Sequence, residues 1–298
     1  MSLRSPVFTG VCTALVTPFT DTGGLHTRKL EELIEQQISR GVDALCVCGT
    51  TGESATLSPQ EQDTLIRLAC KRVNGRVPVL AGTGSNDTKK AVLLSKQAQD
   101  NGADALLVVT PYYNKTTQAG LISHYQTIAR EVELPIVVYN VPGRTGLSFT
   151  AESYRILAMD AQFNGVKEAS GDLGLAAKTL GLCGSDFFLW SGNDEQTVPL
   201  MALGAVGTIS VASNLIPEEM ARLTHLCLKQ EFREAARLQL SLLPLLDALF
   251  SEVNPIPVKT AMELLGMETG PLRPPLFPME EGHRKALADT LRELGLSA

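Results

Sequence analysis

The sequence predicts an α/β chain folded as a (β/α)8 TIM barrel with a small C-terminal helical extension. Short apolar, β-rich runs alternate with longer amphipathic runs, and the alternation repeats eight times. Most apolar runs are nearly continuous, as expected for parallel strands buried on both faces. The first run ends in Thr17-Pro18-Phe19, without the glycine-rich phosphate-binding turn that an open, doubly wound sheet normally carries there. The barrel is therefore favoured over that sheet.

The predicted strands and helices follow one another in strict order. In the first helix, residues 27–40, apolar side chains keep helical spacing from Leu30 to Ile38. The next helix opens at Ser58, with proline at its first position and Glu61 three residues after the cap. The eight predicted strands comprise residues 11–17, 44–48, 77–81, 105–110, 135–140, 165–167, 187–191 and 207–210.

The β signal disappears after Leu226. Three helical patterns follow, at residues 229–253, 258–265 and 281–294. A proline-rich segment, residues 271–278, separates the last two. We therefore expect a barrel catalytic domain at residues 1–226 and a C-terminal helical domain at residues 227–298.

Composition and charge exclude several classes of protein. The chain has 298 residues, of which 44% are hydrophobic and 19% charged, ordinary values for a globular protein. The net charge is −6, and no run of Lys and Arg compensates for it, so we expect no nucleic-acid partner. No window approaches about 18 uninterrupted apolar residues, and the first ten residues do not resemble a signal peptide. We expect no membrane association and a cytoplasmic location.

The cysteine, histidine and glycine spacings indicate neither a metal site nor a bound cofactor. None of the six cysteines forms a Cys-x-x-Cys pair, and the four histidines are scattered singly. Cys46 and Cys48 are expected on one face of a strand, as small core residues in a reducing compartment. Gly82-Thr83-Gly84 lacks the third glycine of a dinucleotide fingerprint, because position 87 is Asp.

Lys167 is the first candidate for catalysis. Of eleven lysines, it is the one that falls within a predicted barrel strand, near the carboxyl end where barrel active sites form. Burial disfavours the charged ammonium and favours the free amine, which can attack a carbonyl. The alternative is a lysine at a strand edge that extends its amine to water.

Polar residues at two other strand ends extend this site. Tyr139 closes the strand before that of Lys167, where a phenol could relay protons; it could instead cap the core. Thr50 and Thr51 lie on a turn between Gly49 and Gly52 and could donate hydrogen bonds to a carboxylate; the alternative is an ordinary threonine turn.

Five segments resemble the dihydrodipicolinate synthase family, within the class I pyruvate-dependent aldolase superfamily. They match that family in order, the first four also in spacing, and the resemblance runs from about residue 7 to residue 296. The segments are Gly49-Thr50-Thr51-Gly52-Glu53, Pro111-Tyr112-Tyr113-Asn114, Tyr139-Asn140-Val141-Pro142-Gly143-Arg144-Thr145, Val166-Lys167-Glu168-Ala169-Ser170-Gly171 and Asn254-Pro255-Ile256-Pro257-Val258-Lys259.

The resemblance implies a lyase that condenses pyruvate with L-aspartate 4-semialdehyde on the lysine and diaminopimelate pathway. By family analogy, Lys167 forms a Schiff base with pyruvate, and no cofactor is needed. Tyr139, Thr51 and Tyr113 would form a proton relay, with Tyr113 reaching into the site of a neighbouring subunit. The family's common assembly is a homotetramer built as a dimer of dimers.

The resemblance also implies the residues that bind the substrates. Thr50 and Thr51 would hold the pyruvate carboxylate, while Gly192 and Ile209 would line the pocket through their backbones. Arg144 would hold the carboxylate of the semialdehyde at the mouth of the site.

Two alternatives remain open at this point. N-acetylneuraminate lyase and other 2-oxo acid aldolases share the lysine and the tyrosine; Arg144 and the segment 112–114 favour the synthase, since a sugar needs neutral hydroxyl partners. A barrel that only binds a 2-oxo acid is the other alternative, against which the intact Lys167 and Tyr139 argue.

One departure from the family concerns regulation. In lysine-inhibited members, the resemblance implies a lysine site at the tight dimer interface, and this chain keeps four of its positions, Ser54, Ala55, Asn86 and Tyr112. Pro59 and Gln62 stand at the histidine positions, and Lys90 stands where a glutamate would pair with the ligand's ammonium. A like charge repels that ammonium, so we expect insensitivity to L-lysine. The alternative is that Lys90 turns to solvent and Asp87 substitutes.

Overall fold

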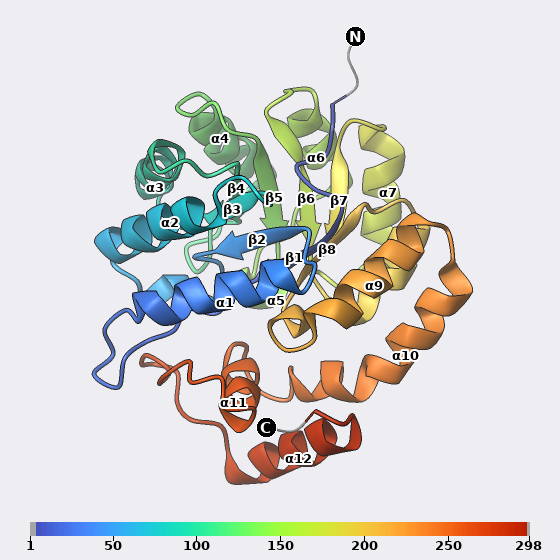
Figure 1. Ribbon diagram of the computed structural model, residues 1–298. Coiled ribbons are helices and arrows are strands. Elements are labelled where there is room, and N and C mark those ends of the chain that lie inside the picture. The colour runs from blue at the N-terminus through green and yellow to red at the C-terminus, as the bar shows by residue number, and fades with distance from the viewer. Residues whose placement is uncertain (1–3, 297–298) are drawn as a thin grey trace.

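Eight parallel strands form a closed barrel in the computed structural model, which describes residues 4–296 (Figure 1). Each strand pairs with the next in sequence, and β1 closes the barrel by pairing with β8. This confirms the predicted fold class. The strands are β1 (Gly10–Ala14), β2 (Ala44–Val47), β3 (Val79–Gly82), β4 (Ala105–Val109), β5 (Ile136–Asn140), β6 (Phe163–Glu168), β7 (Phe188–Ser191) and β8 (Gly207–Ser210).

The boundaries of every strand except β8 shift from the sequence prediction by one to three residues, and two of the larger shifts have a local reason. β1 ends at Ala14, and the pairing stops soon after it: Leu15 N–H still donates to the Cys46 carbonyl of β2, but Val16 N–H donates to the Asn214 side chain instead. β6 begins at Phe163, two positions before the predicted start, because the polar Asn164 interrupts the apolar pattern that predicts a strand. Its side chain accepts from Val7 N–H and donates to the Ser5 carbonyl, so a polar residue is satisfied inside the strand.

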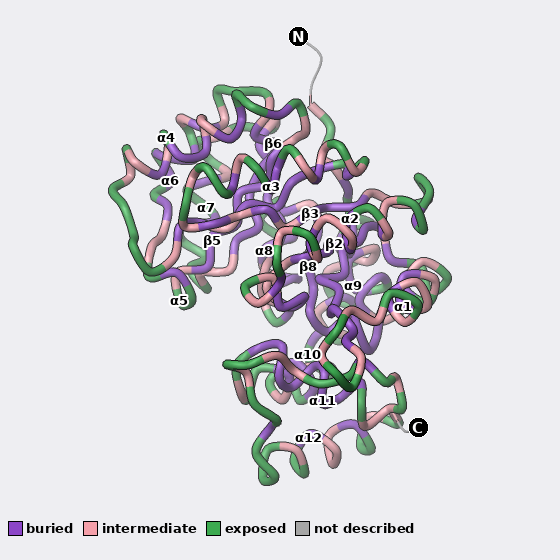
Figure 2. Tube along the Cα trace, turned by 90° about the vertical axis from the view of Figure 1, so that its left-hand side faces the viewer, coloured by how far each residue is buried: buried purple, intermediate pink, exposed green. Residues whose placement is uncertain are grey.

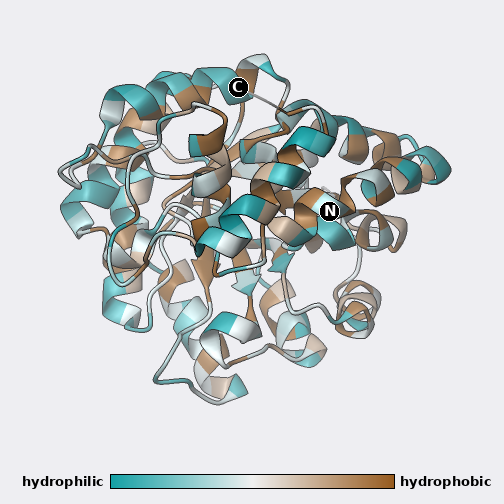
Figure 3. Ribbon diagram, turned by 90° about the horizontal axis from the view of Figure 1, so that it is seen from below, coloured by the Kyte–Doolittle hydropathy of each residue, from teal (hydrophilic) through white to brown (hydrophobic). Residues whose placement is uncertain are grey.

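Helices surround the strands, and the ribbon seen from below shows hydrophilic and hydrophobic segments alternating along them (Figure 3). The predicted cap of the second is present, because Ser58 and Glu61 each bond the other's backbone N–H. The outer helices are α1 (Thr27–Ser39), α2 (Pro59–Val73), α3 (Thr88–Asp100), α4 (Gln118–Ala129), α5 (Pro142–Thr145), α6 (Ala151–Ala158), α7 (Leu173–Cys183), α8 (Thr197–Ala202) and α9 (Pro217–Leu228), with 3-10 turns η1 (Ser54–Thr56), η2 (Asp194–Gln196) and η3 (Ala212–Asn214).

The buried hydrophobic side chains form two clusters, one inside the barrel and one between the strands and the helices. The trace coloured by burial shows the strands largely buried and the exposed segments at the periphery (Figure 2). Cys46 belongs to the inner cluster and Cys48 to the outer one, so the expectation that they share a strand face is wrong. The reason is local: β2 ends at Val47, and Cys48 has a positive φ of 56°, which turns the chain out of the strand.

The C-terminal region packs below the barrel in the view of Figure 1. Its helices are α10 (Phe232–Ala248), α11 (Ile256–Leu264) and α12 (Glu281–Glu293). α10 begins three residues later and ends five residues earlier than predicted, whereas α12 ends one residue earlier. The domain division at residue 226 falls in the last turn of α9 and stays a prediction. Within residues 4–296, no helix combines the length and apolarity needed to cross a bilayer.

Candidate active site

Lys167 and Tyr139 lie side by side near the carboxyl ends of β6 and β5. The two residues are direct partners in the strand register. The Lys167 Nζ atom lies 4.4 Å from the centroid of the Tyr139 ring, and the lysine is only 5% exposed. The predicted nucleophile is therefore buried against the predicted proton carrier, in the position that its strand dictates.

Gly192 and Ile209 lie on the neighbouring strand ends, after β7 and within β8. A Cβ atom built on Gly192 would be 2.6 Å from Ala169 Cβ and 3.1 Å from Lys167 Cε. Glycine is therefore required for the chain to pass this close to the lysine. Ile209 is fully buried and belongs to the cluster inside the barrel, to which Tyr139 also belongs.

A second buried lysine, Lys259 of α11, differs from Lys167 because its amine is paired with a carboxylate. Its Nζ lies 2.9 Å from Glu53 Oε1, and it also donates to the carbonyl of Pro271. Burial lowers the pKa of Lys259. Lys167 has no ion pair within the described part of the chain, so its amine is not committed to a carboxylate.

Thr50 and Thr51 form a tight turn after β2. Gly52 N–H donates to the Gly49 carbonyl, and Glu53 continues the turn with a positive φ of 55°. Thr51 is buried, and its Oγ1 accepts a hydrogen bond from Asn254 Nδ2 at 2.9 Å. The sequence associated the 254–259 segment with the family but did not indicate this contact.

Arg144 and Tyr113 lie at the rim. Arg144, in α5, is exposed, and its Nη2 donates to the backbone carbonyl of Asn254 at 3.1 Å. Tyr113 is 91% exposed with a positive φ of 70°, and the chain does not bring it to its own Lys167.

A cavity of about 300 Å³ opens at the carboxyl ends of β2 to β5. Thr50, Arg144 and Asn254 line it, whereas Lys167, Tyr139 and Thr51 do not. The cavity therefore covers the rim of the predicted site, and the lysine lies deeper, inside the barrel.

Comparisons with known proteins show which family the chain belongs to. The family model described as "Dihydrodipicolinate synthetase family" matches residues 7–294. The chain belongs to this family. It is 49% identical over 292 residues to the 4-hydroxy-tetrahydrodipicolinate synthase of a Thermoanaerobacter species, covering 98% of each chain. It is 48% identical to the synthase of Acetivibrio thermocellus, covering 99% of this chain and 100% of the relative.

Solved structures of the family have the same fold. The dihydrodipicolinate synthase of Thermotoga maritima matches with a TM-score of 0.95 at 44% identity, covering 97% of this chain and 99% of that one. A structure from Cyanidioschyzon merolae, described as having lysine bound, matches with a TM-score of 0.95 at 40% identity, covering 98% and 100%. The family membership expected from the sequence is confirmed.

The positions that the family resemblance linked to lysine inhibition meet at the same cavity. Ser54, Ala55, Gln62, Lys90 and Tyr112 all line it. Lys90 is exposed there and has no ion pair among residues 4–296. Pro59 and Asn86 are not among the lining residues.

Glu168 is a buried carboxylate that the sequence reading did not single out. It accepts hydrogen bonds from Asn140 Nδ2 at 3.0 Å, from Ser170 N–H at 2.8 Å and from the Tyr154 hydroxyl at 3.3 Å. These donors are neutral, and burial raises the pKa of Glu168. The carboxylate joins the ends of β5 and β6, directly beside Tyr139 and Lys167.

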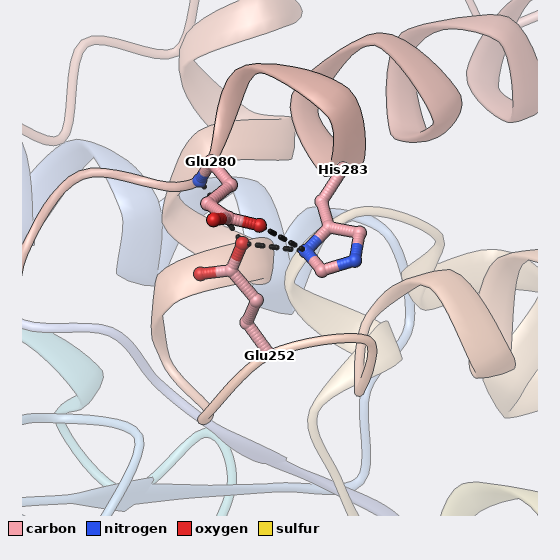
Figure 4. Close-up of side chains that lie close together, drawn as sticks. All are labelled: Glu252, Glu280 and His283. Carbon is pink, nitrogen blue, oxygen red and sulfur yellow. Dashed lines mark hydrogen bonds and ion pairs between the residues drawn. The ribbon is translucent and has the colours of Figure 1, made fainter.

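A group that could ligate a metal lies outside the barrel, and no sequence motif indicates it. Ligand atoms of Glu252, Glu280 and His283 lie within 4.8 Å of one another (Figure 4). Glu252 Oε1 already accepts from Glu280 N–H at 3.0 Å and lies 2.8 Å from His283 Nδ1. The three residues thus bond to each other and fix the start of α12 to the loop before α11.

Proposed function

We propose that this chain catalyses the reaction for which its relatives are named, that of 4-hydroxy-tetrahydrodipicolinate synthase. The reaction joins pyruvate and L-aspartate 4-semialdehyde in the biosynthesis of lysine and diaminopimelate. The observation that carries the proposal is the buried Lys167 amine against Tyr139, without a carboxylate partner among the described residues. Family membership and the names of the relatives support it.

In this proposal the free amine of Lys167 attacks the carbonyl carbon of pyruvate. The carbonyl oxygen leaves as water with the two protons of the amine, and one further proton, supplied through Tyr139, gives a protonated Schiff base. That cation draws electrons from the adjacent methyl group, so the methyl loses a proton, with Tyr139 as the acid and base, and an enamine forms. The enamine carbon then attacks the aldehyde carbon of the second substrate, whose oxygen takes up a proton, and the Schiff base re-forms. Attack of the second substrate's amino group on the Schiff-base carbon closes the ring and releases the Lys167 amine. The protonated Schiff base accepts the electrons itself, so this mechanism needs no cofactor.

The rim residues would bind the two carboxylates. Thr50 and Thr51 offer a hydroxyl and N–H groups to pyruvate, beside the backbone of Gly192 and Ile209. Arg144, the cation on the cavity wall nearest to Asn254, would pair with the carboxylate of the semialdehyde.

We propose a homotetramer, a dimer of dimers, in the cytoplasm. Tyr113, exposed in its own chain, would complete the Tyr139–Thr51 relay of a neighbouring subunit. A second surface is available on α7, where Leu173 and Leu182 are exposed on a helix rich in apolar residues. The six cysteines are free thiols, which suits a reducing compartment. One structure that this chain matches at 44% identity is described as a monomeric variant, so sedimentation is the test of assembly.

The alternative within the superfamily is an aldolase for another substrate, such as N-acetylneuraminate lyase. Arg144 favours the synthase, because an amino-acid semialdehyde carries a carboxylate where a sugar carries hydroxyls. Pyruvate consumption with L-aspartate 4-semialdehyde, compared with cleavage of N-acetylneuraminate, distinguishes the two. Cleavage of the sugar acid without condensation would overturn the proposal.

A further inference from the structure

Asn254 is buried where the C-terminal region meets the barrel. It is 5% exposed and lies in the loop between α10 and α11. Its Nδ2 donates to Thr51 Oγ1 at 2.9 Å, and its backbone carbonyl accepts from Arg144 Nη2 at 3.1 Å. One residue therefore touches a group proposed to act on pyruvate and the group proposed to hold the second substrate.

The bond to Thr51 has a direction. A threonine hydroxyl has one proton to donate and can also accept, whereas an amide N–H only donates. Because Asn254 Nδ2 donates, Thr51 Oγ1 is the acceptor, and its own proton is free for a partner inside the barrel. We infer that Asn254 is a positioning residue that keeps the Thr51 proton available to the relay and aligns Arg144 with it. This inference rests on the proposed function.

The cost of burying Asn254 supports a role other than stability. Its Oδ1 atom is buried and has no hydrogen-bond partner among residues 4–296. A buried acceptor that makes no hydrogen bond destabilises a fold by its desolvation free energy. An apolar side chain of similar size has no such cost. The amide N–H to Thr51 is the one side-chain bond that Asn254 makes there, and that bond points to the active site.

The tail holds Asn254 from both sides. Glu252, two positions earlier, is bonded to the first turn of α12 through Glu280 N–H and His283 (Figure 4). Lys259, five positions later, is paired with Glu53 at the end of the turn that carries Thr51. The loop is therefore fixed relative to the threonine turn, as positioning of a hydroxyl requires.

The test uses a half-reaction that needs pyruvate alone, the exchange of its methyl protons in D₂O followed by NMR. Asn254→Asp has nearly the same shape but accepts the Thr51 proton instead of donating to Thr51 Oγ1. We expect exchange about 10- to 100-fold slower, a fraction of what a proton relay contributes. The borohydride-trapped adduct on Lys167 should still form. Asn254→Ala, which buries no new charge, should be slow as well, and thermal unfolding checks that both variants fold.

A double substitution separates positioning from a general structural effect. If Asn254 acts through the threonine hydroxyl, Asn254→Asp in a Thr51→Val background adds no further loss. Ser251→Ala is the matched control on the same loop, because its hydroxyl bonds, within the described part of the chain, only to the Ala248 carbonyl. Exchange should be unchanged in this variant.

Two results would overturn the inference alone: exchange at the parent rate in both Asn254 variants, or losses from Asn254 and Thr51 that multiply. If the parent chain forms no adduct with pyruvate, the proposed function fails and the inference falls with it.

Discussion

Replacing Gly192 with alanine tests how closely the barrel encloses Lys167. The added Cβ would lie 2.6 Å from Ala169 Cβ, about 1 Å inside the separation at which carbon atoms attract. It would also lie 3.1 Å from Lys167 Cε and from the Glu168 carbonyl oxygen. Either the end of β7 or the lysine must move. An added methyl group in a packed core costs about 1–3 kcal/mol, and we expect Gly192→Ala to lose stability in this range.

The assay pairs urea unfolding with the yield of the borohydride-trapped pyruvate adduct. We expect a lower midpoint and a slower formation of the adduct, because Lys167 Cε is displaced. Gly181→Ala in α7 is the matched control, since nothing lies within 4 Å of its added Cβ. It should be stabilised by about 0.4–1 kcal/mol and react normally. Parent-like stability and adduct formation in Gly192→Ala would show that the end of β7 has room for a side chain beside Lys167.

Three further predictions follow from the rim and from Glu168. Arg144→Ala should raise the KM for L-aspartate 4-semialdehyde by about one to two decades while the pyruvate adduct still forms; unchanged kinetics would favour another aldolase. L-lysine should not inhibit the enzyme, because Lys90 faces the cavity where a ligand ammonium would bind; an inhibition midpoint below about 1 mM, or lysine bound beside Lys90 in a crystal, would contradict this. Burial raises the pKa of Glu168 in the folded state, so its contribution to stability falls as pH rises from the unfolded pKa through the folded pKa. Glutamine does not titrate, so Glu168→Gln lacks this loss of stability. The unfolding free energy of the variant should therefore rise relative to that of the parent between pH 4 and pH 8. A difference between the two that does not change with pH would contradict the raised pKa of Glu168.

Most of the strands could be predicted from the sequence because they are nearly continuous apolar runs, which few other structures produce. The exception is the start of β6, where the polar Asn164 is satisfied by the N-terminal segment 157 or more positions away. The strand face of Cys48 was predicted wrongly for a different reason, because a positive φ in a non-glycine residue leaves no signal in the sequence.

The lysine and tyrosine of the site could be predicted because they lie on consecutive strands, so their adjacency follows from the fold. The contact of Asn254 with Thr51 could not, because it joins positions 203 residues apart and depends on how the tail docks. The group formed by Glu252, Glu280 and His283 was missed for the same reason.

The most direct test of the proposed mechanism is to locate the pyruvate adduct. The protein is incubated with pyruvate, reduced with borohydride, digested and examined by mass spectrometry, and Lys167→Ala is treated in parallel. We expect one reduced pyruvyl group on Lys167, none on the buried but paired Lys259, and none in the variant. An adduct on another lysine, or no adduct in the parent protein, would contradict the mechanism.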